Sequence, residues 1–173
     1  MKFLTSVALL ATAAVAAPSD KLFNLKTSGA SNSTHNDLYL TVGRGVVPDP
    51  LNSEAVFSGV AANRAATFYF ANSTIYWNAH SSAPYALDLI NVDGVRKERA
   101  QISVDPTHGS KGFSITPEGV KGPSETWEGW LWCPVDAEAG QFFPNLHFLN
   151  KNVQEPAVPA GCDKINLQAV PRS

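Results

Sequence analysis

Two carboxylates flank a tryptophan in the last third of the chain, where Glu125 and Glu128 lie on either side of Trp127. A pair of carboxyl groups beside an aromatic ring is the set that a glycosidase uses. One group donates a proton, the other acts as base or nucleophile, and the ring stacks against the sugar. Residues i and i+3 of a strand point to opposite faces, so the two groups converge only if a bulge or turn separates them. A glycoside hydrolase is therefore the least favoured function.

Tryptophans in the same region suggest a second kind of chemistry. Trp130 and Trp132 are two residues apart and share one face of an expected strand, and Trp77 and Trp127 are further candidates. Exposed aromatic rings bind sugars because the C–H face of a pyranose complements the π cloud. The favoured alternative is that this strand belongs to the core, where tryptophan often packs beside a disulfide. A carbohydrate-binding module that uses these four residues remains a hypothesis.

Histidine and serine give no catalytic or metal-binding pattern. None of the histidines, at positions 35, 80, 108 and 147, forms a His-x-His or His-Glu-x-x-His sequence. We expect His35 to be exposed beside a sequon and His147 to face outward from a strand. Residues 108–112, His-Gly-Ser-Lys-Gly, do not form a nucleophile elbow, because no helical pattern follows them. The sequence therefore predicts no catalytic residue, no metal site and no cofactor.

The N-terminus has the pattern of a secretory signal peptide. A positive start at Met1–Lys2 is followed by an apolar stretch from Phe3 to Val15 and by the small-x-small sequence at residues 14–16. We expect cleavage after Ala16, because cleavage one residue later would leave Pro18 directly after the scissile bond. The prediction is a leader at residues 1–16 and a single secreted domain at residues 17–173.

Charge and hydropathy exclude two classes of partner. The chain has 13 basic and 15 acidic residues, and removal of Lys2 with the leader changes the net charge from -2 to -3. This mild negative charge argues against capture of nucleic acid or of an anionic membrane. No apolar stretch after the leader is long enough for a membrane helix.

Export also predicts two covalent modifications. Cys133 and Cys162 are the two cysteines of the chain, and in an oxidising compartment they are expected to pair. The bridge would close a loop of about thirty residues and stabilise the fold by roughly 3–4 kcal/mol in the chain-entropy model. Asn32 and Asn72 each begin an Asn-Ser-Thr sequon, so we expect both to be glycosylated on exposed turns.

The elements that must position these residues are expected to be strands. Apolar and polar residues alternate with period two, with aromatic and β-branched enrichment, in several short segments. These segments are residues 38–42, 68–70, 75–77, 87–90, 102–104, 113–115, 130–132 and 165–169. Glycine and proline lie between them, and residues 71–73 suggest a tight hairpin at Asn72. The best helical candidate, Asn52 to Ala62, is weak. The pattern predicts an all-β domain, an antiparallel β-sandwich or a small β-barrel.

Several short blocks together carry a resemblance. They are Phe23–Leu25, Asp37–Leu40, Glu54–Phe57, Thr67–Phe70 with the following sequon, Gly112–Ile115, Gly129–Cys133 and Cys162–Val170. In this order they resemble a family of small secreted proteins of filamentous fungi. They are similar, more loosely, to fungal cell-wall proteins linked to phialide development and to IgE-binding or elicitor-type proteins. The resemblance implies a secreted or wall-associated β-protein with one disulfide, and it carries over no catalytic residue.

Leader, strand pattern and resemblance together predict a non-enzymatic secreted protein. It is expected to act at the cell wall or at a host interface, as a wall-associated or effector-like protein. Its expected partner is a cell-wall polysaccharide or a host protein. A carbohydrate-binding module is the alternative.

Overall fold

The chain folds almost entirely into strands. The computed structural model describes residues 21–43, 51–59, 61–80, 84–92, 94–103, 109–135, 143–153 and 158–172. In chain order the strands are β1 (Phe23–Ser28), β2 (Tyr39–Gly43), β3 (Asn52–Ser58), β4 (Phe68–Ala71), β5 (Thr74–Trp77), β6 (Tyr85–Leu89), β7 (Lys97–Ser103), β8 (Ser114–Thr116), β9 (Gly119–Lys121), β10 (Trp127–Cys133), β11 (Asn145–Asn150) and β12 (Asp163–Pro171). Two 3₁₀ turns, η1 (Ser33–His35) and η2 (Ala62–Arg64), are the helical elements of these described residues.

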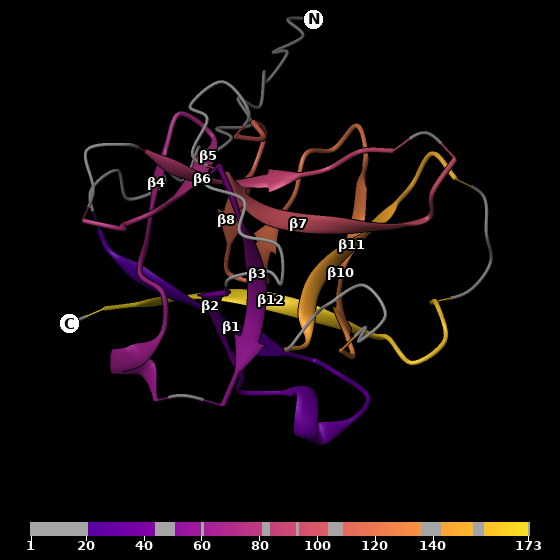
Figure 1. Cartoon of the computed structure of the whole chain (residues 1–173), viewed down its shortest axis with the longest axis horizontal. Helices are drawn as coiled ribbons and strands as arrows, with labels where there is room; N and C mark the ends of the chain where they lie inside the picture. Colours follow the sequence, from indigo (N-terminus) through magenta and orange to yellow (C-terminus); the bar gives the residue numbers. More distant parts are fainter. Residues whose placement is uncertain are drawn as a thin grey trace, which may run out of the picture.

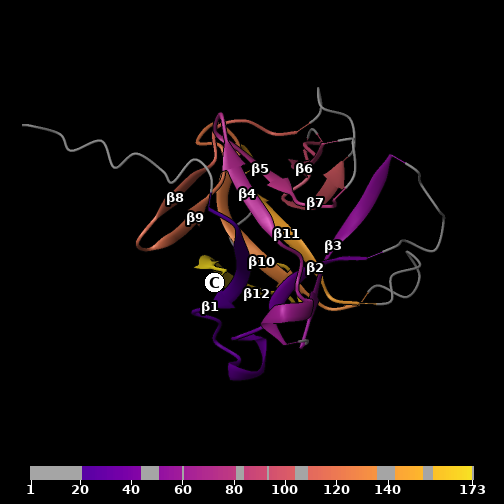
Figure 2. The same ribbon diagram turned by 90° about the vertical axis from the view of Figure 1, so that its left-hand side faces the viewer.

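Nine of the strands close into an antiparallel barrel (Figures 1 and 2). The circuit runs β1–β4–β5–β6–β7–β3–β11–β10–β12 and returns to β1. Closure joins the first and last strands, which pair over six positions from Phe23 opposite Pro171 to Ser28 opposite Asn166. The β8–β9 hairpin attaches to β12 and extends to one side of the barrel (Figure 2). The all-β prediction is thus confirmed, and of the sandwich and the barrel the structure has the barrel.

Aromatic and aliphatic side chains fill the interior because strand residues alternate between the two faces of the sheet. The largest fully buried side chains include Phe57, Phe68, Trp130 and Phe148. Strand β7 shows the alternation clearly, since Glu98, Ala100 and Ile102 are buried while Lys97 and Arg99 are exposed. The barrel is therefore packed with side chains rather than hollow.

The helical candidate at Asn52 to Ala62 is wrong. Residues 52–58 form strand β3, which pairs with β2 on one side and with β7 and β11 on the other. Three consecutive residues of β3, Ala55, Val56 and Phe57, are all buried. Burial on both faces removes the period-two pattern from the sequence, so this strand could not be recognised by alternation.

The predicted leader at residues 1–16 lies outside the described residues. Secretion therefore stays a prediction.

Candidate functional site

A loop between β1 and β2, residues 29–36, lies against the start of β12, and we call it the cap loop. It begins at Gly29, whose φ is +70°; a Cβ there would lie only 2.7 Å from Nδ2 of Asn166. The positive φ favours glycine here, whereas a Cβ would meet only the movable end of the Asn166 side chain. Asn32 then forms the N-cap of η1, with Oδ1 accepting hydrogen bonds from the backbone N–H of Thr34 at 3.1 Å and from its hydroxyl at 2.8 Å. The loop is thus shaped partly by its own residues.

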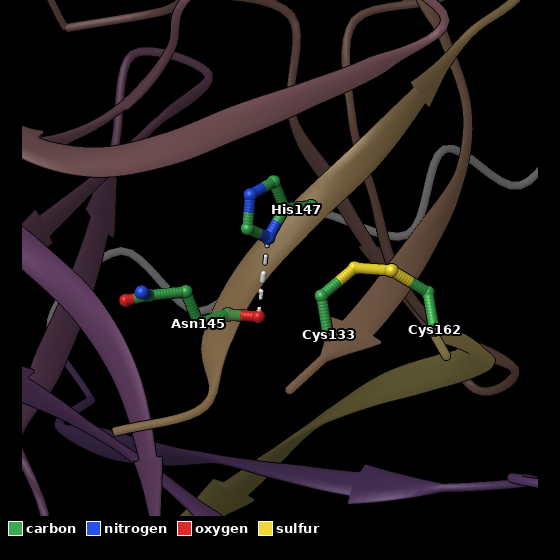
Figure 3. The surroundings of a disulfide bond; sticks show 4 residues. All are labelled: Cys133, Asn145, His147 and Cys162. Carbon is green, nitrogen blue, oxygen red and sulfur yellow. Dashed lines mark hydrogen bonds between the residues drawn. A yellow bond between two sulfur atoms is a disulfide. The ribbon is translucent and has the colours of Figure 1, made fainter. Parts of the chain in front are cut away.

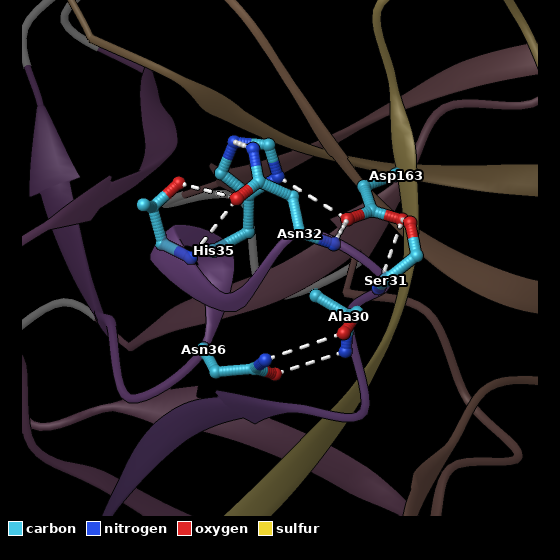
Figure 4. A network of polar contacts seen from close by, with 7 residues as sticks. Ala30, Ser31, Asn32, His35, Asn36 and Asp163 are labelled. Carbon is cyan, nitrogen blue, oxygen red and sulfur yellow. Dashed lines mark hydrogen bonds and ion pairs between the residues drawn. The ribbon is translucent and has the colours of Figure 1, made fainter.

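Asp163, the first residue of β12, ties the cap loop to the barrel (Figure 4). Its Oδ1 accepts hydrogen bonds from the Ser31 hydroxyl at 2.8 Å and from the Ser31 backbone N–H at 3.3 Å. Its Oδ2 accepts a hydrogen bond from the backbone N–H of Asn32 at 2.9 Å and lies 3.3 Å from Nδ1 of His35. Burial raises the pKa of the Asp163 carboxyl group, but these hydrogen bonds together outweigh burial, so the pKa is lowered.

His35 is the second anchor of the cap loop. Its ring stacks on the ring of Trp132, with centroids 3.6 Å apart and an interplanar angle of 16°, and only 15% of its side chain is exposed. Its Nε2 lies 3.4 Å from Nδ2 of Asn32 (Figure 4). Both ring nitrogens have partners if Nδ1–H donates to Asp163 and Nε2 accepts from Asn32. The expectation that His35 is exposed is therefore wrong.

The disulfide lies beside this cluster. Cys133 at the end of β10 is bonded to Cys162 directly before β12, as predicted (Figure 3). The bridge packs with Leu131 and Leu149 in a second small apolar cluster. His147 is buried close to it, with Nδ1 3.4 Å from the carbonyl oxygen of Asn145. Leu146 and Phe148 lie in the main core, so His147 between them faces outward as expected, but this outer face is covered as well and His147 is buried.

An open cleft of about 560 Å³ lies next to the disulfide and the cap loop. It is lined by Gly29, Ser31, Val158, Cys162, Asp163, Lys164, Ile165 and Asn166. We call it the β12 cleft. Asp163 and Ser31 are committed to each other, whereas Lys164 acts on the described residues through its charge, which contributes to the lowered pKa of Glu128. The side chains of Lys164 and Asn166 are exposed and remain available to a ligand.

The tryptophans do not form an exposed platform. Trp130 is 1% exposed and lies in the core, so the hypothesis that it binds sugar is wrong. Trp132 lies on the same face of β10 as Trp130, as expected, but the ring of His35 covers the ring of Trp132. Trp77 and Trp127 are half-buried and pack against the same core. The core alternative explains the positions of all four residues.

The two candidate carboxylates for sugar hydrolysis are in different environments. A bulge does lie between Trp127 and Gly129, yet Glu128 forms an ion pair with Arg96 at 2.6 Å while Glu125 is exposed on the preceding turn. The hydrogen bond from Arg96 lowers the pKa of Glu128. A general acid needs a raised pKa, so this arrangement does not support Glu128 as the acid of a glycosidase.

Glu98 is a buried carboxylate that the sequence analysis missed. It is 3% exposed, and its two oxygens accept hydrogen bonds from Nδ2 of Asn150 at 2.8 Å and from the backbone N–H of Val92 at 2.6 Å. Its alternation with Ala100 and Ile102 could have placed it on the inward face.

Both sequons lie on the surface, since Asn32 and Asn72 are exposed. The hairpin predicted at Asn72 is confirmed, with Ala71 paired to Thr74 across a two-residue turn. Glycosylation of the two asparagines stays a prediction.

We expect Asp163→Asn to destabilise the protein by about 1–3 kcal/mol at pH 7, because an amide cannot accept all the hydrogen bonds that the carboxylate accepts. The folded-state pKa of Asp163 lies below the ordinary value of 3.8. Its stabilisation is therefore present above that value and is lost as pH falls through the folded-state pKa. Urea unfolding of both proteins at pH 7 and pH 3 checks this. An equal difference at the two pH values would contradict it, and the same comparison in a His35→Gln background isolates the carboxylate from the imidazole.

Comparison with known proteins gives one match. The model of a family described as a domain of unknown function, DUF7907, matches residues 20–171. No curated protein matches the chain, and no solved structure matches it. Within the described ranges no helix is long and apolar enough to span a bilayer. The same part of the chain contains no group of three or more His, Cys, Asp or Glu side chains suited to a metal ion.

Proposed function

We propose that this chain, which belongs to the DUF7907 family, is a non-enzymatic secreted protein that acts at the cell wall or at a host interface. We further propose that it binds a cell-wall polysaccharide in the β12 cleft. The cleft is the observation that carries the proposal.

The cleft has the size and chemistry of a carbohydrate site. Its volume of about 560 Å³ falls within the range of roughly 300–1,000 Å³ typical of ligand pockets. The Asn166 amide can donate to and accept from sugar hydroxyls, and the Lys164 ammonium can donate to them. Val158, which is 38% exposed, supplies apolar surface for the C–H face of a sugar ring.

The walls of the cleft are held rigidly. Cys162 is fixed by the disulfide to β10, and Ser31 is fixed by its two hydrogen bonds to Asp163. A wall that is ordered before binding reduces the entropy cost of association. Rigidity therefore favours recognition of a ligand with few contacts, as expected for a short stretch of polysaccharide.

The residues best suited to catalysis are committed to structural contacts. His35 is stacked and hydrogen-bonded, Asp163 accepts from the cap loop, and Glu128 is paired with Arg96. A catalytic group must be free to exchange a proton with substrate. These contacts support binding rather than turnover.

The test is sedimentation of the secreted protein with insoluble chitin, β-1,3-glucan and cellulose. We expect binding to one polymer, competed by its soluble oligomer. The double substitution Lys164→Gln and Asn166→Ala should weaken binding about tenfold or more, because it removes hydrogen bonds worth about 1.4 kcal/mol or more in total. Lys121→Gln is the matched control, since it makes the same charge change on an exposed lysine of β9 and should bind like the wild type.

Three results would contradict parts of this proposal. Recovery of the chain from the cytosol alone would exclude secretion. Equal binding by the double variant and the control would exclude the cleft as the site. Failure to bind any polymer would exclude a polysaccharide ligand and would leave a protein of the host as the partner. Because Asn32 neighbours the cleft residue Ser31, binding is measured with and without enzymatic removal of glycans.

A further inference from the structure

The hairpin of β4 and β5 places a sequon asparagine at its tip. Asn72 and Ser73 form the two-residue turn, with φ of +50° and +59°, and both are exposed. Positive φ at both positions identifies the type I′ turn that joins strands most tightly, and asparagine tolerates this conformation better than most residues. The tip is thus a fixed point of attachment rather than a loose loop.

The outer face of the same hairpin carries a pair of tyrosines. Tyr69 lies opposite Tyr76, and their rings stack with centroids 5.1 Å apart at an interplanar angle of 15°. Their neighbours Phe68 and Ile75 point inward and are fully buried, so the tyrosines must point outward. Both tyrosines are half-buried, and burial, followed by the charge of Tyr76, raises the pKa of Tyr69.

One small pair of residues separates these rings from the turn. Ala71 and Thr74 are paired between Asn72 and the tyrosine pair, on the same face of the hairpin as the tyrosines. Thr74 is buried beside Gly109, so Ala71 is the member of this pair that is partly exposed. Alanine at position 71 places no large side chain between the turn and the Tyr69 ring. At a rise of about 3.3 Å per residue, the backbone of Tyr69 lies about 10 Å from that of Asn72.

We propose that the outer face of Tyr69 and Tyr76 is the packing site of the first sugars of a glycan on Asn72. The apolar face of N-acetylglucosamine complements an aromatic ring, and attachment at the hairpin tip gives the sugar a high local concentration at the rings. The glycan then stabilises the hairpin as well as shielding it. This inference rests on the secretion part of the proposed function, and it is independent of the β12 cleft.

The test is a thermodynamic cycle on protein made in a glycosylating host. Both proteins carry Asn32→Asp, which blocks the other sequon and keeps an oxygen acceptor for the cap of η1. One retains both tyrosines, and the other carries Tyr69→Thr and Tyr76→Thr, which preserve strand propensity. The melting temperature of each protein is measured before and after treatment with peptide-N-glycosidase. The enzyme changes Asn72 to aspartate in both proteins, so the effect of that change cancels when the two are compared.

We expect glycan removal to lower the melting temperature of the tyrosine protein by about 2–4 °C more than that of the threonine variant. Trimming to the single N-acetylglucosamine on Asn72 should preserve most of this difference. Equal losses in the two proteins would overturn the proposal, and so would mass spectrometry showing exported protein without a glycan on Asn72. If the protein is not exported, both this inference and the proposed function are wrong. If the protein is exported but binds no polymer, only the proposal of a polysaccharide site in the β12 cleft is wrong.

Discussion

Replacing Trp130 with alanine is expected to destabilise the barrel by about 3–5 kcal/mol, the range measured for loss of a large buried aromatic side chain. Trp130 is 1% exposed, and its ring lies 6.4 Å from that of Phe113 and 5.6 Å from that of Trp127. Its Nε1–H donates a hydrogen bond to the carbonyl oxygen of Val120 at 2.7 Å. Alanine would remove the ring contacts and would leave this carbonyl oxygen without its partner.

Trp130→Phe separates the two effects. Phenylalanine keeps most of the apolar ring but lacks the donor, so we expect a smaller loss of about 1–3 kcal/mol from the unsatisfied carbonyl of Val120. Urea unfolding followed by circular dichroism measures both variants. If Trp130→Ala changed the free energy of unfolding by less than 1 kcal/mol, Trp130 could not be a core residue. If the alanine variant does not fold, the phenylalanine variant still tests the hydrogen bond.

Alternation located at least part of β2, β4, β5, β6, β7, β8, β10 and β12. It missed β3, where Ala55, Val56 and Phe57 are all buried. It placed His147 on the face opposite Leu146 and Phe148, but alternation along β11 could not reveal that this face is covered too.

The cap loop could not be predicted, because its contacts span the chain. His35 and Asp163 are 128 residues apart, and neither lies in a recognisable pattern. Closure of the barrel by β1 and β12 brings the two ends of the described chain together and so creates this cluster. The cysteine pair is the exception among such long-range contacts, since the cysteine count and the expected export predicted it.

The sequence could not decide between core and platform for the tryptophans, because both require the same spacing. Trp130 and Trp132 share a face in either case. The structure decides between core and platform by the partner of each tryptophan. Trp130 donates a hydrogen bond to the carbonyl oxygen of Val120, and the ring of Trp132 stacks against the ring of His35. The sheet instead places a stacked aromatic pair outward at Tyr69 and Tyr76.

Removing the disulfide is expected to cost about 3–4 kcal/mol, because the bond between Cys133 and Cys162 spans 29 positions and restricts the unfolded chain. The bond also packs with Leu131 and Leu149, so the double substitution Cys133→Ala and Cys162→Ala loses some apolar contact as well. Urea unfolding with and without reductant checks this. The midpoint of the wild type should fall in reductant, and the midpoint of the double variant should not change.

Loss of the disulfide should also make the β12 cleft less ordered. Cys162 lines the cleft and directly precedes Asp163, which holds the cap loop. Reduction of the disulfide therefore loosens both the cleft wall at Cys162 and the attachment of the cap loop at Asp163. We therefore expect reduced protein to bind polysaccharide less tightly at urea concentrations where it is still folded. A Leu87→Ala protein provides the control, because Leu87 is fully buried in β6, whose neighbours in the sheet are β5 and β7 rather than β12, so it loses core stability away from the cleft. If both proteins lost affinity equally, binding would follow global stability; if only the reduced protein did, the disulfide would act by ordering the cleft.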